Sequence, residues 1–192
     1  MGREFELKYR ADAAAISRIR EAFDGFTPIT METAYYDTPD RLFSRLHWTL
    51  RRRYENGSAV CTLKTPAPDR SRGEWEVARD DIRKAIPELC KLGAPEALLS
   101  RVEAPLEISC GARFTRLAKT VALPDAVVEL ALDRGILLAG GAEAPFAEVE
   151  VELKEGSEES ARSFAEDLAA KFGLAEEPLS KHKRAMLLAQ SR

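Results

Sequence analysis

Charged and apolar residues alternate strictly near the start of the chain, in the segment Glu4-Phe5-Glu6-Leu7-Lys8-Tyr9-Arg10. In a β-strand, successive side chains point to opposite faces of the sheet. The alternation therefore predicts a strand with Glu4, Glu6 and Lys8 on one face and apolar side chains on the other. A strand of this kind is most often half buried, with its charges in water. Two neighbouring carboxylates could instead hold a divalent cation such as Mg²⁺, beside a lysine that binds phosphate.

The length and charge of the chain limit what it can be. Its 192 residues are enough for one substantial core, and we expect a single domain over residues 1–192. The net charge of −3 excludes a generally basic nucleic-acid binder, so no nucleic-acid partner is expected. No apolar run approaches the roughly 20 residues that a membrane helix needs, so no membrane partner is expected.

The cysteines indicate a reducing compartment. Cys61, Cys90 and Cys110 are odd in number and far apart, and they match neither a zinc site nor a disulfide framework. The N-terminus enters the alternating segment at once, which leaves no room for a signal peptide. We therefore expect the protein in the cytoplasm.

Helical periodicity is found in four parts of the chain. The first helix is expected to be capped by Asp12 and ended by Gly25, and Ser157 is expected to cap a later one. Pro87 is expected to divide the second helical region into two short pieces. The four regions are 12–24, 81–103, 158–172 and a last helix after Ser180.

Strand patterns fill most of the remaining sequence. Asn56-Gly57 is a strong hairpin signal between two strand patterns. Together with the first segment, the patterns predict an α+β protein built on a long antiparallel sheet of about eight strands. The further strands are expected at 33–36, 48–54, 59–65, 73–79, 113–121, 126–133 and 146–154.

Charges of one sign recur along single strand faces. At about 4 Å and an effective dielectric near 20, each pair of like charges costs roughly 4 kcal/mol. If these faces point inward, metal ions would offset the repulsion of the carboxylates and polyphosphate that of the cations. An inward orientation requires a closed barrel with an apolar outer face covered by helices, and eight strands can enclose one small ligand. The pairs and sets are Arg51 and Arg53, Thr62 and Lys64, Glu74 and Glu76, Glu129 and Asp133, and Glu148, Glu150 and Glu152.

These residues resemble the CYTH superfamily, the triphosphate tunnel metalloenzymes, over nearly the whole chain. The first segment is similar to the family's N-terminal Glu-x-Glu-x-Lys motif, and the likeness is closest to the bacterial inorganic triphosphatases. Further similar segments follow in order: Tyr35-Tyr-Asp-Thr-Pro39, Leu50-Arg-Arg-Arg53, Thr62-Leu-Lys64, Glu74, Phe114-Thr-Arg116, Glu129-Leu-Ala-Leu-Asp133, Glu148-Val-Glu-Val-Glu152 and Ser180-Lys181 with Arg184.

The resemblance implies an eight-stranded antiparallel β-barrel tunnel with flanking amphipathic helices, in which Mg²⁺ or Mn²⁺ supports hydrolysis of a triphosphate, most simply inorganic tripolyphosphate. The implied metal ligands are Glu4, Glu6, Glu74, Asp133, Glu148, Glu150 and Glu152. The implied phosphate-binding residues are Lys8, Arg51, Arg53, Lys64, Arg116, Lys181 and Arg184. The implied catalytic residues are Lys8, Glu4, Glu6, Asp133, Glu148 and Glu150.

The resemblance leaves alternatives open. The expected partner is a small molecule that contains a triphosphate, and a homodimer is also left open. A class IV adenylyl cyclase would make cyclic AMP from ATP in the same tunnel, but no clear adenine pocket is found in the sequence. Thiamine triphosphate is another candidate substrate, although no residues that would sandwich its thiazolium are apparent. A non-catalytic polyphosphate-binding module would not need so many carboxylates.

Overall fold

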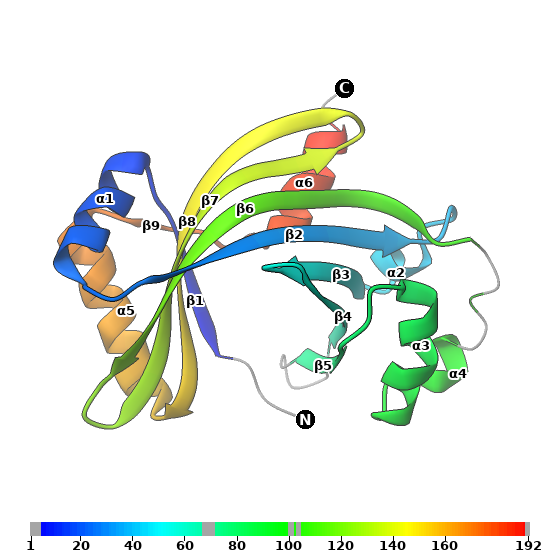
Figure 1. Ribbon diagram of the computed structural model, residues 1–192, viewed down its shortest axis with the longest axis horizontal. Helices are drawn as coiled ribbons and strands as arrows, with labels where there is room; N and C mark the ends of the chain where they lie inside the picture. The colour runs from blue at the N-terminus through cyan, green and yellow to red at the C-terminus, as the bar shows by residue number, and fades with distance from the viewer. Residues whose placement is uncertain (1–4, 67–71, 100–101, 103–104, 191–192) are drawn as a thin grey trace.

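One curved antiparallel sheet dominates the computed structural model, which describes residues 5–66, 72–99, 102 and 105–190 (Figure 1). The described strands follow the order β5-β4-β3-β2-β6-β7-β8-β1-β9. The predicted α+β class with a long antiparallel sheet is therefore confirmed. The strands are β1 Glu6–Arg10, β2 Thr27–Asp37, β3 Thr49–Glu55, β4 Ser58–Pro66, β5 Arg72–Val77, β6 Glu107–Ala122, β7 Ala126–Ala139, β8 Ala142–Gly156 and β9 Ala175–Glu176.

The helices lie at both ends of this sheet and under its centre. Figure 1 shows α1 and α5 at one end, α3 and α4 at the other, and α6 beneath β6, β7 and β8, all three of which it contacts. No helix in the described part of the chain is long and apolar enough to cross a membrane. The helices are α1 Ala13–Ala22, α2 Leu42–Arg45, α3 Ile82–Lys91, α4 Glu96–Leu99, α5 Glu158–Phe172 and α6 Lys181–Gln190.

The sheet is strongly curved, but its two edges are not joined in the described residues. Among the strands that the structure describes, β5 pairs with β4 alone and β9 with β1 alone. The closed eight-stranded barrel is therefore not observed, and the two-residue β9, which was not predicted, brings the described strands to nine. Closure would require hydrogen bonds between the edge strands, and β9 offers only two residues. Register shifts at Tyr35/Tyr36 and Val127/Val128 contribute to the curvature.

The apolar sides of the strands form the outer face of the sheet at the end covered by α1 and α5. Tyr9 of β1 and Val149 and Val151 of β8 are buried there in one cluster with Ile19 of α1 and Leu168 of α5. The predicted orientation of β1 and β8, with their apolar side chains packed under amphipathic helices, is confirmed. The charged side chains of the same strands consequently point to the opposite, inner face.

The inner face is divided between α6 and a cavity. Ala185 and Met186 of α6 are buried against Phe114, Leu137 and Phe146, which come from β6, β7 and β8. Because these apolar residues occupy one part of each strand, α6 covers that part only. The charged parts of the strands face the first turn of α6 and the cavity.

Short-range signals position several elements as predicted. Asn56 and Gly57 both have positive φ, 49° and 86°, as a two-residue hairpin turn requires. The Asp12 carboxylate accepts a hydrogen bond from the amide of Ala15 at 2.7 Å, and the Ser157 hydroxyl accepts one from the amide of Ser160 at 3.2 Å. These N-caps confirm where α1 and α5 begin.

Several expectations about element limits were wrong. α1 ends at Ala22, before Gly25, and β2 spans Thr27–Asp37 instead of residues 33–36. Pro87 lies inside α3 without dividing it, because buried Ile82, Ala85 and Leu89 on both sides of the proline hold the helix against the sheet. A proline removes one backbone donor from a helix, a cost that such packing offsets here. The strands β6, β7 and β8 are also longer than expected, since their outer ends lack a clear charge alternation but remain paired.

Candidate functional site

A cavity of about 1270 Å³ lies on the inner face of the sheet, between its two ends. Most of the residues that the sequence singled out line it. Asp133, Glu148 and Arg184 do not line it, and Glu4 lies outside the described residues. The predicted residues that line the cavity are Glu6, Lys8, Arg51, Arg53, Lys64, Glu74, Arg116, Glu150, Glu152 and Lys181.

Arg51 and Arg53 of β3 and Lys64 of β4 form one wall of the cavity, which we call the basic wall. Arg51 and Lys64 reach Glu74 of β5 at 4.0 and 3.2 Å. In the described part of the chain, the Nε atoms of Arg51 and Arg53 are buried without a hydrogen-bond partner, as are those of Arg52 and Arg184, which do not line the cavity. Buried donors without partners are costly, and an anion in the cavity would satisfy those of Arg51 and Arg53.

The pKa of Arg53 is lowered by its surroundings in the basic wall. Burial and the neighbouring Arg51 lower the pKa of Arg53, although Glu55 and Glu76 act in the opposite direction. Arg52, between the two, points to the outer face, where its guanidinium lies over the rings of Tyr36 and Tyr54 at 5.9 and 5.0 Å. Arg52 therefore faces away from its two neighbours, as the alternation of side chains along a strand requires.

Among the carboxylates that line the cavity, three lie side by side on β1, β8 and β7, and we call them the open row: Glu6, Glu152 and Glu129. Glu152 of β8 is the cross-strand partner of both Glu6 in β1 and Glu129 in β7. About a quarter of each side chain is exposed, at 24%, 26% and 27%. Their nearest described cations are Lys8, Lys154 and Arg116, at 3.9, 2.8 and 3.5 Å. Like charges directly opposite each other destabilise a sheet unless a cation lies between them.

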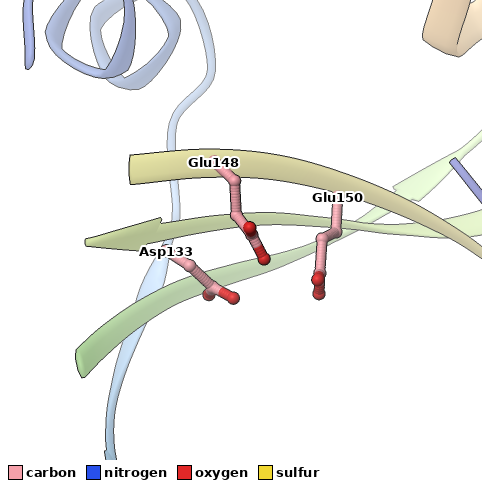
Figure 2. A group of neighbouring side chains, drawn as sticks. All are labelled: Asp133, Glu148 and Glu150. Carbon is pink, nitrogen blue, oxygen red and sulfur yellow. The ribbon is translucent and has the colours of Figure 1, made fainter. Parts of the chain in front are cut away.

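A second carboxylate group, the buried cluster, consists of Asp133, Glu148 and Glu150. Figure 2 shows the three side chains extending from β7 and β8 toward the same side of the sheet. One oxygen from each lies within 4.8 Å of the others, a spacing that could hold a metal ion. Asp133 and Glu148 are fully buried and Glu150 nearly so.

Three protein cations contact the buried cluster. The ammonium of Lys181, the first residue of α6, lies 2.7 Å from Asp133 and 2.8 Å from Glu150 and also contacts Glu148. Arg116 of β6 donates to both oxygens of Asp133 at 2.8 Å and contacts Glu150. Arg184 of α6 contacts Glu148. Three positive groups therefore face three carboxylates.

The pKa values in the buried cluster follow from this arrangement. Burial raises the pKa of Glu148, despite the opposing charge of Lys181. Burial acts the same way on Glu150, but Lys181 and Arg116 outweigh it and hold its pKa well below the usual range. Burial alone would lower the pKa of Lys181, but Glu150, Asp133 and Glu148 together raise it. The cluster is thus organised around a charged Lys181.

The two carboxylate groups differ in how well they suit a divalent cation. Mg²⁺ and Mn²⁺ prefer carboxylate oxygens and keep several water ligands. The open row fits this requirement because it offers carboxylates of adjacent strands beside a water-accessible cavity. The carboxylates of both groups contact protein cations, but in the buried cluster one ammonium contacts all three carboxylates, and two of the three have no exposed surface.

Other residues of the site were missed or weighed lightly in the sequence. Glu177 is buried between Arg184 and Arg10, at 3.6 and 3.8 Å, in a short irregular segment without periodicity. The ring of Tyr35, in β2, lies 4.7 Å from the ring of His182, in α6, and both residues line the cavity. No local pattern in the sequence indicates these contacts. Two of them, Glu177 with Arg184 and Tyr35 with His182, depend on where α6 is placed.

Known proteins share the sequence and the fold of this chain. The pattern of the CYTH domain family matches residues 2–186. An inorganic triphosphatase of Haemophilus influenzae is 30% identical over 158 residues, which are 80% of this chain and 44% of that protein. The chain thus spans less than half the length of this relative.

Solved structures with the same fold are more distant in sequence. A crystal structure of a putative adenylate cyclase from Bacillus halodurans superposes with a TM-score of 0.65 at 21% identity, over 94% of this chain and 96% of that one. HpAC1 from Hippeastrum, a putative adenylyl cyclase described as having a dominant triphosphatase activity, gives a TM-score of 0.69 at 18% identity, over 98% and 95%. At these identities the likeness shows the fold.

Proposed function

The chain belongs to the CYTH domain family, and we propose that it is a metal-dependent triphosphatase acting on inorganic tripolyphosphate within the inner-face cavity. The observation that carries the proposal is the basic wall, where Arg51, Arg53 and Lys64 of two paired strands line one cavity. The relative from Haemophilus influenzae, named an inorganic triphosphatase, supports the same substrate.

The basic wall would bind the phosphate chain. Arginine presents a planar fork of donors that matches two phosphate oxygens, whereas lysine acts as a point charge. In this proposal Arg51 and Arg53 hold phosphate oxygens through such forks, and Lys64 and Lys8 neutralise the ends of the chain. Arg116 lines the cavity as well, but its guanidinium contacts Asp133 and Glu150, so it would reach phosphate only with its remaining donors.

The open row would hold the divalent cation opposite the basic wall. A bound Mg²⁺ or Mn²⁺ supplies charge neutralisation of phosphate oxygens and lowers the pKa of a coordinated water. Glu6, Glu152 and Glu129 are the proposed metal ligands. Glu150 lies two residues before Glu152 on β8, opposite Lys8 of β1. Glu74 contacts Arg51 and Lys64 and would orient the basic wall. Glu4 remains a predicted ligand outside the described residues.

Water is the proposed nucleophile. Phosphoryl transfer requires mainly positioning and charge stabilisation from a protein. Ser44 and Ser180 also line the cavity, but the Ser44 hydroxyl donates to Asp37 at 2.6 Å and the Ser180 hydroxyl accepts from the amide of Lys183 at 3.1 Å. Both hydroxyls thus have structural partners, which supports direct attack by water over a covalent intermediate.

A substrate panel tests the proposal. The purified protein is incubated with tripolyphosphate, pyrophosphate, thiamine triphosphate or ATP, each with Mg²⁺, Mn²⁺ or EDTA, and released phosphate and cyclic AMP are measured. The expected result is metal-dependent phosphate release that is fastest from tripolyphosphate. Formation of cyclic AMP from ATP without turnover of tripolyphosphate would contradict it.

The size of the cavity keeps an adenylyl cyclase as the second candidate. Ligand pockets commonly have volumes of about 300 to 1,000 Å³. A cavity of about 1270 Å³ exceeds that range, so it would admit a nucleoside attached to the triphosphate. The cyclic AMP measurement in the same panel separates this reaction from hydrolysis.

A further inference from the structure

The buried cluster and the open row have different access to the cavity, although they belong to the same strands. Asp133 and Glu148 have no exposed surface and do not line the cavity, whereas each member of the open row does. Glu150 and Lys181 do line the cavity, so an ion that entered the cluster from there would meet the Lys181 ammonium.

The charges of the cluster are already satisfied by the protein. Lys181 contacts all three carboxylates, so its ammonium lies in the position that a metal ion would take among them. The rings of Phe114 and Phe146 flank this ammonium at 5.0 and 5.6 Å. A buried cation enclosed by carboxylates and aromatic rings is difficult to displace, because its release leaves unpaired buried charges.

The same contacts attach α6 to the sheet. Lys181 and Arg184 lie on the first turn of the helix, and both reach the cluster. Ala185 and Met186 follow immediately and are buried against the apolar part of the inner face. Charged and apolar contacts thus fix the same end of α6, and displacement of Lys181 would disturb both.

From these contacts we propose that the Lys181 ammonium is a built-in cation of the buried cluster, which therefore anchors α6 and takes no divalent ion. The inference rests on the proposed function, because it concerns which carboxylates serve the metal. Metal binding is then left to the open row of Glu6, Glu152 and Glu129. Asp133 and Glu148 act as positioning residues for α6 and for Arg116.

Binding of Mn²⁺ to the purified full chain tests the inference without substrate, with free Mn²⁺ measured by electron paramagnetic resonance. Asp133→Asn should bind the same number of Mn²⁺ ions as wild type, with an affinity changed by less than about twofold. Glu152→Gln should weaken the affinity for Mn²⁺ at least about tenfold. A tenfold or greater loss of affinity in Asp133→Asn would overturn the inference. The double variant Glu148→Gln with Arg184→Met removes one acid and one base, so it keeps the cluster neutral and should also bind Mn²⁺ as wild type does.

Removing the built-in cation should create a metal site. Lys181→Met should bind one more Mn²⁺ than wild type, and Mn²⁺ should raise its melting temperature more than that of wild type. Lys183→Met, two residues further along α6, is the matched control and should gain no site. An unchanged number of Mn²⁺ sites in Lys181→Met would overturn the inference. A wild-type protein that binds Mn²⁺ at the open row without hydrolysing tripolyphosphate would contradict the proposed function and support this inference.

Discussion

The open row and the buried cluster both use β7 and β8 and the same alternation of side chains, yet they differ in burial and in the source of their counter-ions. Glu152 and Glu148 both belong to β8 and face the same side, four residues apart. Glu152 is about a quarter exposed beside the cavity, whereas Glu148 is enclosed with Lys181 and Arg184. The difference arises from α6, which covers one part of the inner face only. An acidic strand face therefore becomes a candidate metal site only where no helix supplies its counter-ions.

The largest expected effect is on the open row. Glu6→Gln should lower the turnover of tripolyphosphate about 100-fold or more, because it removes a proposed metal ligand without changing the shape of the side chain. Glu21→Gln, an exposed carboxylate on α1, is the control and should have wild-type turnover. Phosphate release at saturating Mn²⁺ measures both. If Glu6→Gln had wild-type turnover, Glu6 would not be a metal ligand, and the open row would be an ordinary solvent-exposed strand surface.

The basic wall provides a matched pair within one strand. Arg53→Gln should raise the KM for tripolyphosphate about 10- to 100-fold, since a charge-assisted hydrogen bond contributes about 1.5–3 kcal/mol. Arg52→Gln should leave the KM unchanged, because this side chain lies over Tyr36 and Tyr54 on the outer face. Equal effects of the two substitutions would show that β3 does not present alternate faces to the substrate.

The pH dependence of stability sharpens the description of the buried cluster. The folded pKa of Lys181 is raised, so its stabilising contribution is fully present below the unfolded lysine pKa of about 10.5 and is lost as the pH rises further. The free energy of unfolding of wild type, minus that of Lys181→Met, should be constant from pH 8 to 10. Above 10.5 it should fall by up to about 1.4 kcal/mol per pH unit. Urea unfolding measures it, and a difference that grows above pH 10.5 would contradict a charged, paired Lys181.

The smallest effect is expected at an exposed ion pair on the outer face. Arg113 and Glu143 approach to 3.3 Å, but more than half of each side chain is exposed. Arg113→Gln should therefore change the free energy of unfolding by about 0.5 kcal/mol or less. The same urea measurement applies, and a loss comparable to that of Lys181→Met would mean that burial does not distinguish the ion pairs of this sheet.

Local patterns in the sequence were sufficient to predict much of the fold. The alternation in β1 and β8 places their charges on the inner face, and Asn56-Gly57 gives the hairpin. Only tertiary contacts could reveal that α3 continues through Pro87 or that the sheet edges are not joined. Both features depend on packing or pairing between segments that are distant in the sequence, so the local spacing of apolar residues could not predict them.

The candidate site was predictable as a set of residues but not in its internal division. The alternation identifies Glu148 and Glu152 equally, since both are acidic and lie on the same face. Their separation into buried and open groups depends on α6, whose position on the inner face is set by Ala185 and Met186. Lys181 was accordingly expected to bind phosphate, whereas its ammonium contacts three carboxylates. That expectation remains a prediction that the substrate measurements can test.

A phosphorus NMR time course of tripolyphosphate tests directly whether the protein is a metal-dependent triphosphatase, because it follows substrate and products together. With Mn²⁺-free protein and added Mg²⁺, the account predicts that each tripolyphosphate consumed yields one pyrophosphate and one phosphate. It also predicts that EDTA stops the reaction and that Arg53→Gln slows it at low substrate concentration while Arg52→Gln does not. Tripolyphosphate that persists unchanged with Mg²⁺ and with Mn²⁺, or that is consumed equally in EDTA, would contradict the account.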